Sequence, residues 1–452
     1  MIPAERLLQG GVRDAAAAIA RGEVTARALV AAALGRSAAL NGTLRAFAEI
    51  WPDAEARPGG GHLLAGLPVA HKDIFARPHR QPLCGAARPF AGPPLPPSPA
   101  LAAVQATGAA ETGVLTMAEF ALGTTGTNAV HGDAGNPWAI GRCSGASSSG
   151  SAVAVAAGLV FASLGTDSGA SCRLPASFCG VVGVKPSPGA VPTDGVFPMS
   201  WSLDAVGMLA RGLDDAAILL AAARGEATPD APIQNPALRI GIPAGYYTDH
   251  LHRDVAGAWD QGRRRLEHAG HRVLDVPVVE TPAIRSLMRL VMRAEAAALH
   301  RPLIAADPGN YPLSVRRFLA SGEATLATDY LDALRARGAM LRQALATTFA
   351  RVDVLLTPTV PVLPPLYAEI ADAADPEAWR RVTLLAHATQ PASFLGLPAI
   401  SVPAALTPDG LPIGLQLIGR PGEDAALFRA ALPIEAALRA ATPLSPSLSR
   451  AT

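Results

Sequence analysis

The chain has 452 residues, half of them hydrophobic and 17% charged, a composition that can bury a large core. The length fits a large α/β unit, and the composition is unlike that of a disordered chain. The net charge is +1, and without a run of Lys or Arg nothing in the sequence attracts a nucleic acid.

The first half of the chain alternates between helical and strand patterns. Helical patterns cover residues 10–50, 101–107 and 151–158, and strand patterns cover 67–71, 112–116 and 160–165. The longest apolar run, 152–164, is shorter than the roughly 20 residues that a membrane span needs. The N-terminus also lacks the pattern of a secretory signal. We therefore expect a soluble cytoplasmic protein.

The second half begins with strand 238–242, helix 254–269 and strand 271–279, which together indicate a βαβ unit. A helical region follows at 281–350, and further strands are predicted at 352–357, 399–403 and 413–419. In the helical region we interpret the apolar residues at helical spacing as core rather than pocket; they are Met288, Leu290, Met292 and Leu319.

The four cysteines show no metal-ligand spacing. They are Cys84, Cys143, Cys172 and Cys179, and we expect buried free thiols, as in a reducing compartment.

Two stretches rich in Ser and Gly carry the candidate chemistry. Residues 142–151 (RCSGASSSGS) would by composition be a flexible loop, but the packed segments on both sides favour a fixed one. Residues 168–171 (SGAS) are small enough for successive backbone N–H groups to converge on one point, which suits a developing oxyanion. A seryl oxygen beside such a point can attack a carbonyl.

Lys72 ends the apolar strand pattern at 67–71, in a sequence where lysine is almost absent. A buried lysine without an acid partner tends to lose its proton, because loss of water disfavours the cation. Asp73 should face the other way on a continuing strand, so an ion pair between these neighbours is less favoured but stays open.

A series of segments, in order along nearly the whole chain, resembles the motifs of the amidase signature family. Residues 66–73 (GLPVAHKD) follow the family's G-[IV]-P-[IV]-x-[VI]-K-D pattern except at the second and sixth positions, which are Leu67 and His71. The other matching segments are 117–123, 145–151, 165–176, 183–186, 202–211, 353–359, 396–403 and 410–419.

The resemblance implies an amidase signature fold, in which helices cover both faces of a central, mixed, twisted β-sheet. We expect a single domain, 1–452, with the signature core at 60–225 and a C-terminal return to the core at 381–440. The variable helical region between them, 226–380, is expected to build the substrate pocket, chiefly through its segment 281–350.

The family's catalytic groups fall on three residues of this sequence. Lys72 corresponds to the base, Ser147 to the bridging serine that follows a cis peptide bond, and Ser171 to the nucleophile. The resemblance implies an acyl-enzyme mechanism that needs no cofactor or metal. Backbone N–H groups of Ser168, Gly169, Ala170 and Ser171 would bind the oxyanion, and Asp167 and Arg173 would support their loop.

Four of the departures from the family's motifs lie in or beside the expected site. Ala146 replaces the glycine before the bridging serine, which would place the cis bond between residues 146 and 147, and Ser149 replaces another glycine. Ala170 replaces the glycine before the nucleophile, so the two added methyl groups narrow the site slightly. His71 replaces an aliphatic residue, and on a strand it should point away from Lys72 and be structural.

Three other functions compete with a stand-alone hydrolase. A Ser–His–Asp hydrolase would carry a G-x-S-x-G elbow, which the sequence lacks. A noncatalytic member acting as a partner subunit should have lost one of the three catalytic positions. The A subunit of a glutamyl-tRNA(Gln) amidotransferase generally has an acid near position 386, where this chain has alanine.

We therefore favour a stand-alone hydrolase of amides or carbamates (urethanes), with aryl amides and biuret-like compounds as further candidates. We expect a small-molecule substrate, with neither a nucleic acid nor a membrane as partner. A homodimer is one of the assemblies left open.

Overall fold

The structure is a computed structural model that describes residues 3–56, 61–230, 237–243, 245–279, 281–372, 374–439 and 446. Its described residues form an 11-stranded sheet in the order β1-β3-β2-β4-β6-β5-β10-β11-β9-β7-β8. The strands are β1 Phe47–Ile50, β2 Pro68–Lys72, β3 Ala110–Leu115, β4 Ala162–Thr166, β5 Val182–Lys185, β6 Val206–Ala210, β7 Arg239–Pro243, β8 Arg272–Val276, β9 Val354–Pro358, β10 Ala399–Leu406 and β11 Pro412–Ile418.

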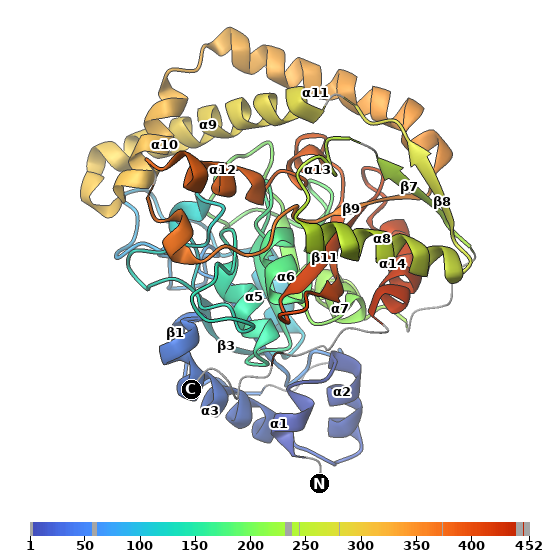
Figure 1. The fold of residues 1–452 in the computed structure, drawn as a ribbon. Helices are drawn as coiled ribbons and strands as arrows, with labels where there is room; N and C mark the ends of the chain where they lie inside the picture. The colour runs from blue at the N-terminus through green and yellow to red at the C-terminus, as the bar shows by residue number, and fades with distance from the viewer. Residues whose placement is uncertain are drawn as a thin grey trace.

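Helices surround this sheet, and together the elements confirm the predicted α/β fold with a mixed sheet (Figure 1). The helices are α1 Ala4–Leu7, α2 Val12–Ala20, α3 Ala26–Leu44, α4 Pro99–Ala106, α5 Ser149–Ala156, α6 Arg173–Cys179, α7 Leu213–Ala223, α8 Arg253–His268, α9 Thr281–Ala306, α10 Leu313–Glu323, α11 Ala327–Thr347, α12 Pro376–Leu385, α13 Gln390–Phe394 and α14 Asp424–Arg439.

The sheet is mixed: two groups of neighbouring strands are parallel, and the other neighbouring strands are antiparallel. Strand β2 runs parallel to both β3 and β4, and β7 runs parallel to both β8 and β9. The parallel pair β7 and β8, joined through α8, confirms the predicted βαβ unit. The predicted boundaries within the domain remain a prediction, and residues 231–236, next to one of them, lie outside the described residues.

Both faces of the central strands are buried, because each face meets a different set of helices. In β6, Met208 belongs to a core cluster with residues of α7, whereas the neighbouring Leu209 belongs to a second cluster with residues of α5 and α6. Successive side chains of a strand point to opposite faces, so this alternation places the two helical layers on opposite sides of the sheet. Strands buried on both faces read as continuous apolar runs.

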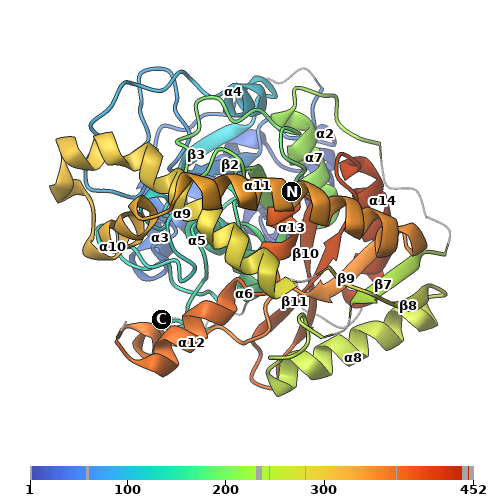
Figure 2. The ribbon, with the colours of Figure 1, turned by 90° about the horizontal axis from the view of Figure 1, so that it is seen from above.

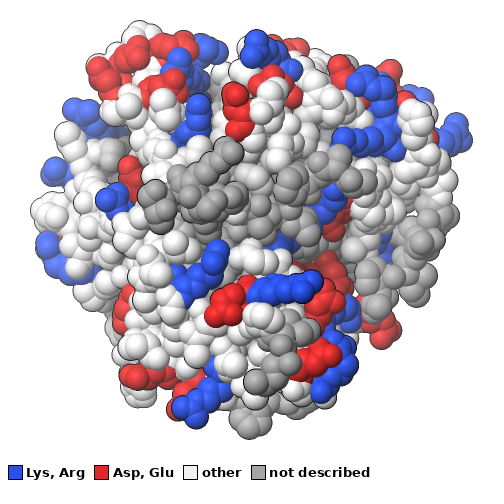
Figure 3. Space-filling model, turned by 60° about the horizontal axis from the view of Figure 1, so that its bottom comes forward, with Lys and Arg blue, Asp and Glu red and all other residues white. Residues whose placement is uncertain are grey.

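Helices α9 and α11 lie side by side at the end of the molecule opposite α1–α3 (Figures 1 and 2). Residues of both helices share a core cluster with residues of β9 and α13, so this helical layer is packed onto the sheet. In Figure 3, basic and acidic side chains are intermixed on the face shown. Lys72 and Lys185 are the only lysines of the sequence and both are 0% exposed, so the basic surface groups are arginines.

The four cysteines are buried and free, as the sequence predicted. Within the described residues, no helix combines the length and the apolar character that crossing a membrane requires.

Candidate active site

Lys72, the last residue of β2, directs its amine into the protein rather than toward solvent. Its Nζ atom donates hydrogen bonds to the hydroxyl of Ser147 at 2.7 Å and to the hydroxyl of Thr166 at 2.8 Å. Asp73 instead forms an ion pair with Arg80 at 3.1 Å. The alternative of an ion pair between Lys72 and Asp73 is therefore wrong.

The sheet brings Lys72 and Thr166 together. Strands β2 and β4 are parallel neighbours, and their register pairs His71 with Leu164. The carboxyl ends of parallel neighbours meet at the same edge of the sheet, where ligands and catalytic groups of α/β proteins commonly lie. Lys72 ends β2 and Thr166 ends β4, so this edge places their side chains in contact.

Burial dominates the electrostatics of Lys72. It lowers the pKa of Lys72 from 10.5 to about 8, because loss of water disfavours the ammonium form. The buried carboxylates of Asp204 and Asp167 oppose this shift of the Lys72 pKa but do not cancel it. The nearby Cys172 thiol stays protonated because burial raises its own pKa, so it adds no negative charge. Near pH 8 the amine can therefore accept a proton.

His71 lies on the strand beside Lys72 but faces a different set of groups. Its Nε2 atom lies 2.7 Å from the carboxylate of Glu111, and its Nδ1 atom lies 2.9 Å from the backbone oxygen of Lys72. These contacts, together with full burial of the ring, agree with a structural role for this histidine.

Ser147 lies at the start of α5, just after two residues with positive φ. The predicted cis peptide bond before it is wrong, since the described chain contains no cis peptide bond. Gly145 and Ala146 instead turn the chain with φ of 86° and 46°.

The loop after β4 presents a row of free backbone donors. The N–H groups of residues 168–171 have no acceptor among the described residues. Asp167, just before them, accepts hydrogen bonds from the backbone N–H groups of Cys172 and Arg173 at 3.1 and 3.3 Å. These bonds hold both ends of the loop and leave the N–H donors of residues 168–171 free.

Arg173 ties this loop to distant parts of the chain. The guanidinium is fully buried and makes two hydrogen bonds of 2.9 Å to the carboxylate of Asp167. Its remaining donors reach the backbone oxygen of Thr389, the side chain of Gln416 and the hydroxyl of Ser393 at 2.7–2.9 Å. All five N–H donors of the guanidinium are thus satisfied, which a rigid buried support needs.

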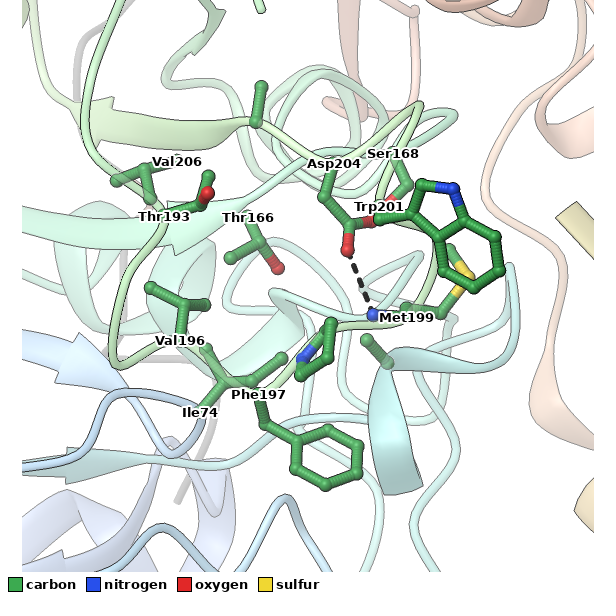
Figure 4. A pocket seen from close by; sticks show the side chains of 13 residues that line it. Ile74, Thr166, Ser168, Thr193, Val196, Phe197, Met199, Trp201, Asp204 and Val206 are labelled. Carbon is green, nitrogen blue, oxygen red and sulfur yellow. Dashed lines mark hydrogen bonds between the residues drawn. The ribbon is translucent and has the colours of Figure 1, made fainter. Parts of the chain in front are cut away.

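The Ser168 side chain turns away from the nucleophile position and donates to the carboxylate of Asp204. That carboxylate also accepts from the backbone N–H groups of Met199 and Ser200 at 2.8 and 2.9 Å. Figure 4 shows Ser168, Asp204 and Met199 around a small cavity of ≈ 100 Å³, which Thr166 also lines. This small cavity therefore lies beside the threonine that contacts Lys72.

A larger cavity of ≈ 310 Å³ lies next to the loop of residues 168–171, and Ser171 forms part of its wall. Ser171 is half-buried and makes no hydrogen bond to Ser147 within the described chain. The cavity is lined by Glu119, Ala121, Leu122, Gly123, Thr124, Thr125, Thr127, Ala146, Gly169, Ala170, Ser171, Met199, Arg285, Arg289, Met292, Arg293, Ser314, Phe318, Trp379, Val382, Thr383, Ala386 and Gln390.

The lining only partly follows the prediction from the sequence. Helices α9 and α10 contribute, as expected for the segment 281–350, but no residue of α11 does. Met292 was interpreted as core; it packs against the core and also lines the cavity, because this side of α9 faces the loop of Gly169. Ala386 lies in the cavity wall, where an acid would have faced the substrate.

Within the described residues, no group of three or more His, Cys, Asp or Glu side chains is placed to hold a metal ion. The only carboxylate in the lining of the large cavity belongs to Glu119.

Comparison with known proteins shows to which family this chain belongs. A family model described as Amidase matches residues 28–428. This chain belongs to the amidase family. As a member of this family, the protein is an enzyme that acts on C–N bonds.

Its relatives include a protein named as an amidase and proteins named as subunits of an amidotransferase. The chain is 35% identical to the A subunit of the glutamyl-tRNA(Gln) amidotransferase of Anaeromyxobacter sp. (strain K), over 96% of this chain and 97% of that protein. The crystal structure of an amidase matches with a TM-score of 0.85 and 32% identity, covering 95% of this chain and all of the other. The structure of the corresponding amidotransferase A subunit from Thermotoga maritima matches with a TM-score of 0.77 and 26% identity, covering 97% and 96%.

These relatives correct the expectation about partners. The sequence suggested a small-molecule substrate without a nucleic-acid partner, on the basis of net charge and the absence of basic runs. Several relatives with 32–35% identity are named as A subunits of a glutamyl-tRNA(Gln) amidotransferase, so that expectation is wrong. Net charge failed as a guide because it describes the whole chain and not one surface of it.

Several groups around the site were not predicted from the motifs. Thr166 and Asp204 lie inside the segments 165–176 and 202–211, but nothing in the motifs showed that they contact Lys72 and Ser168. The arginines of α9 had a readable signal, since they recur every four residues and so share one helix face.

Proposed function

We propose that this amidase family member cleaves the C–N bond of an amide or carbamate through Ser171, with Ser147 as proton bridge and Lys72 as base. The observation that supports this most is the buried hydrogen bond of 2.7 Å between Lys72 and Ser147. It joins an amine of lowered pKa to a hydroxyl, without a carboxylate to hold the proton.

The proposed reaction begins when the Ser171 oxygen attacks the substrate carbonyl. The Ser171 proton passes to Ser147, which gives its own proton to the neutral amine of Lys72. The free N–H groups of residues 168–171 stabilise the negative charge that develops on the carbonyl oxygen. The same proton relay, run in reverse, protonates the leaving nitrogen, and water then releases the acyl group from Ser171.

The first step needs a contact that the ligand-free geometry does not make, since Ser171 and Ser147 are not hydrogen-bonded. Catalytic hydrogen bonds often tighten only when substrate binds. In this proposal the substrate carbonyl, seated against the N–H groups of the loop, draws Ser171 toward Ser147.

The test is release of ammonia or amine from a panel of a primary aliphatic amide, an anilide, an aryl carbamate, biuret and glutamine. Ser171→Ala is expected to abolish turnover of every substrate that the unsubstituted chain accepts. Ser321→Ala, an exposed serine on α10, serves as the matched control and should keep full activity. Activity that survives in Ser171→Ala would show that another group is the nucleophile.

A second candidate function is that of the A subunit of a glutamyl-tRNA(Gln) amidotransferase, in which the cleaved amide supplies nitrogen to a second substrate. Its support is the 35% identity over 96% of the chain to a protein of that name. The amide-cleaving chemistry would be the same, so the site geometry is compatible with both candidates.

The two candidates differ in what glutamine turnover requires. As part of an amidotransferase, the chain should cleave glutamine slowly alone and at least several-fold faster once partner subunits and glutamyl-tRNA are added. As an independent amidase, its best substrate should be cleaved at a rate that these additions leave unchanged. We place either activity in the cytoplasm, where free buried thiols such as the four cysteines persist.

A further inference from the structure

Three arginines of α9 line the same cavity as Ser171. Arg285, Arg289 and Arg293 follow one another at intervals of four residues and therefore lie along one face of the helix. Each is half-buried. Three like charges on one face destabilise a helix, so such a row is unusual without a compensating anion.

The protein itself supplies little compensation. Arg285 donates to the backbone oxygen of Thr383 at 3.0 Å, and the guanidinium carbon of Arg293 lies 5.8 Å from the centre of the Phe318 ring. Within the described chain, Arg289 has no hydrogen bond, and none of the three arginines forms an ion pair with a carboxylate.

Glu119, the one acid of the cavity lining, does not balance this row. Its Oε1 atom accepts a hydrogen bond from the backbone N–H of Ala129 at 2.6 Å, which directs it to the protein. Burial raises the pKa of Glu119, so part of its negative charge is lost as pH falls toward that raised value. The cavity therefore carries excess positive charge.

The excess of positive charge affects the pKa of Arg289. The pKa of Arg289 is lowered, first by burial and then by the charges of Arg293 and Arg285. A bound anion would relieve both effects, since it replaces lost water and offsets the repulsion.

Helix α9 is also close to the reacting loop. A side-chain carbon at Gly169 would lie 2.9 Å from the terminal methyl group of Met288 and 3.3 Å from that of Met292. Because the three arginines and Ser171 line the same cavity of ≈ 310 Å³, one bound substrate can contact both.

We propose that the cavity selects amides that carry a carboxylate remote from the bond to be cleaved, and that Arg289 binds this carboxylate. The inference rests on the proposed function and specifies its substrate class. Glu119 is the one acid of the lining and one of its oxygens is bonded to the backbone N–H of Ala129, so the cavity has three arginines to bind a carboxylate but a single, partly engaged acid to bind an ammonium group. An acidic amide without an ammonium group, such as glutaramate, should therefore be preferred to glutamine. Glutamine has the same chain length but carries an ammonium group in addition.

The test compares glutaramate with pentanamide, a neutral amide of the same chain length. The unsubstituted chain should show a higher kcat/KM for glutaramate than for pentanamide or glutamine. Arg289→Gln should lower the ratio of glutaramate to pentanamide kcat/KM by about 10- to 100-fold, the range expected for a lost charged hydrogen bond. Arg301→Gln, an exposed arginine on the same helix, is the matched control and should leave the ratio unchanged.

A binding measurement separates this inference from the catalytic proposal. Calorimetry with glutarate on Ser171→Ala should give binding that Arg289→Gln weakens about tenfold or more and that Arg301→Gln does not change. Arg293→Gln provides a second variant with the same expected direction. Equal glutarate affinity in all these variants, or a higher kcat/KM for glutamine than for glutaramate, would overturn the inference. Loss of the Ser171 role alone would leave the binding result standing.

Discussion

The Nζ atom of Lys72 lies 2.7 Å from the Oγ atom of Ser147, and both side chains are fully buried. Such a pair is stable only if the amine can be neutral or finds other polar contacts, because an isolated buried ammonium is costly. Thr166 supplies the second contact at 2.8 Å. The amine of Lys72 is therefore held next to the Ser147 hydroxyl, and no carboxylate among the described residues forms an ion pair with it.

The pH dependence of turnover should follow the ionisation of Lys72. Since the neutral amine is the proposed base, kcat/KM should rise about tenfold per pH unit below pH 8 and level off above it. The sign follows from the lowered pKa of about 8, because the protonated form below this value cannot accept a proton. A pH series from 6 to 10 on a neutral amide measures this rise.

The ionisation itself can be observed, since Lys72 and Lys185 are the only lysines. Lysine labelled with ¹⁵N should give two side-chain signals by NMR, and Lys72→Met assigns them. A Lys72 signal that stays protonated at pH 10, in an enzyme already at full activity, would contradict its role as base.

The two hydroxyls beside Lys72 should differ in importance. Ser147→Ala removes the proposed proton bridge and should lower kcat by about 10²- to 10⁴-fold, the usual contribution of positioned proton transfer. Thr166→Val removes only the second contact of the amine and should cost far less, with its main effect on the pH at which activity rises. Equal losses in the two variants, measured with one amide over the same pH range, would argue against a bridge at Ser147.

The buried pair of Arg173 and Asp167 should be a major support of stability. Burial pushes the pKa of Asp167 upward, but the charge and hydrogen bonds of Arg173 outweigh this and lower it. Arg173→Met leaves a buried carboxylate without its partner and should lower the free energy of unfolding by about 3–5 kcal/mol. Arg335→Met, which breaks an exposed ion pair with Asp332, should cost less than about 1 kcal/mol.

Urea denaturation of both variants at pH 7 measures these differences. The loss of unfolding free energy should also change differently with pH in the two variants. The destabilisation by Arg173→Met should shrink as pH falls, because an unpaired buried Asp167 becomes protonated more readily. A loss that is small at pH 7 and unchanged at lower pH would show that the loop is held by other contacts.

Two glycine substitutions should act in opposite directions. A side-chain carbon at Gly183 in β5 would lie 2.4 Å from the backbone oxygen of Cys172, so Gly183→Ala must displace the loop next to Ser171. Gly35 lies in the middle of α3, is exposed and has no neighbour within 4 Å. Gly35→Ala should therefore stabilise the protein by about 0.5–1 kcal/mol, whereas Gly183→Ala should lower both melting temperature and activity.

The sequence was sufficient to predict elements whose pattern is local. The strand ending at Lys72 and the βαβ unit from β7 to β8 have clear apolar runs and turns. Strands β5 and β6, which join the two halves of the sheet, are short and contain Gly among their apolar residues, and they were not predicted. Their pairing depends on contacts between distant segments, which no local pattern records.

The site shows the same limit. The motifs predicted where Lys72, Ser147 and Ser171 lie in the chain, but not that Thr166 would share the amine. The turn before Ser147 was predicted with a cis bond by resemblance, whereas positive φ angles provide it here. Contacts of Arg289 could not be predicted, because they depend on how α9 rotates over the loop.

The scarcity and burial of lysine shape the acid–base behaviour of the whole molecule. Burial lowers the pKa of Lys185 to about 7, below that of Lys72, and raises the pKa of every cysteine. The pKa values of all five tyrosines are raised as well, those of Tyr246 and Tyr330 to about 12. Nearly all the remaining cations are arginines, whose charge persists in this range except at Arg211, where burial lowers the pKa to about 10. Between pH 9 and 11 the protein therefore has little buffering capacity, and its net charge stays close to zero. At such a net charge, electrostatic repulsion does little to keep copies of the protein apart.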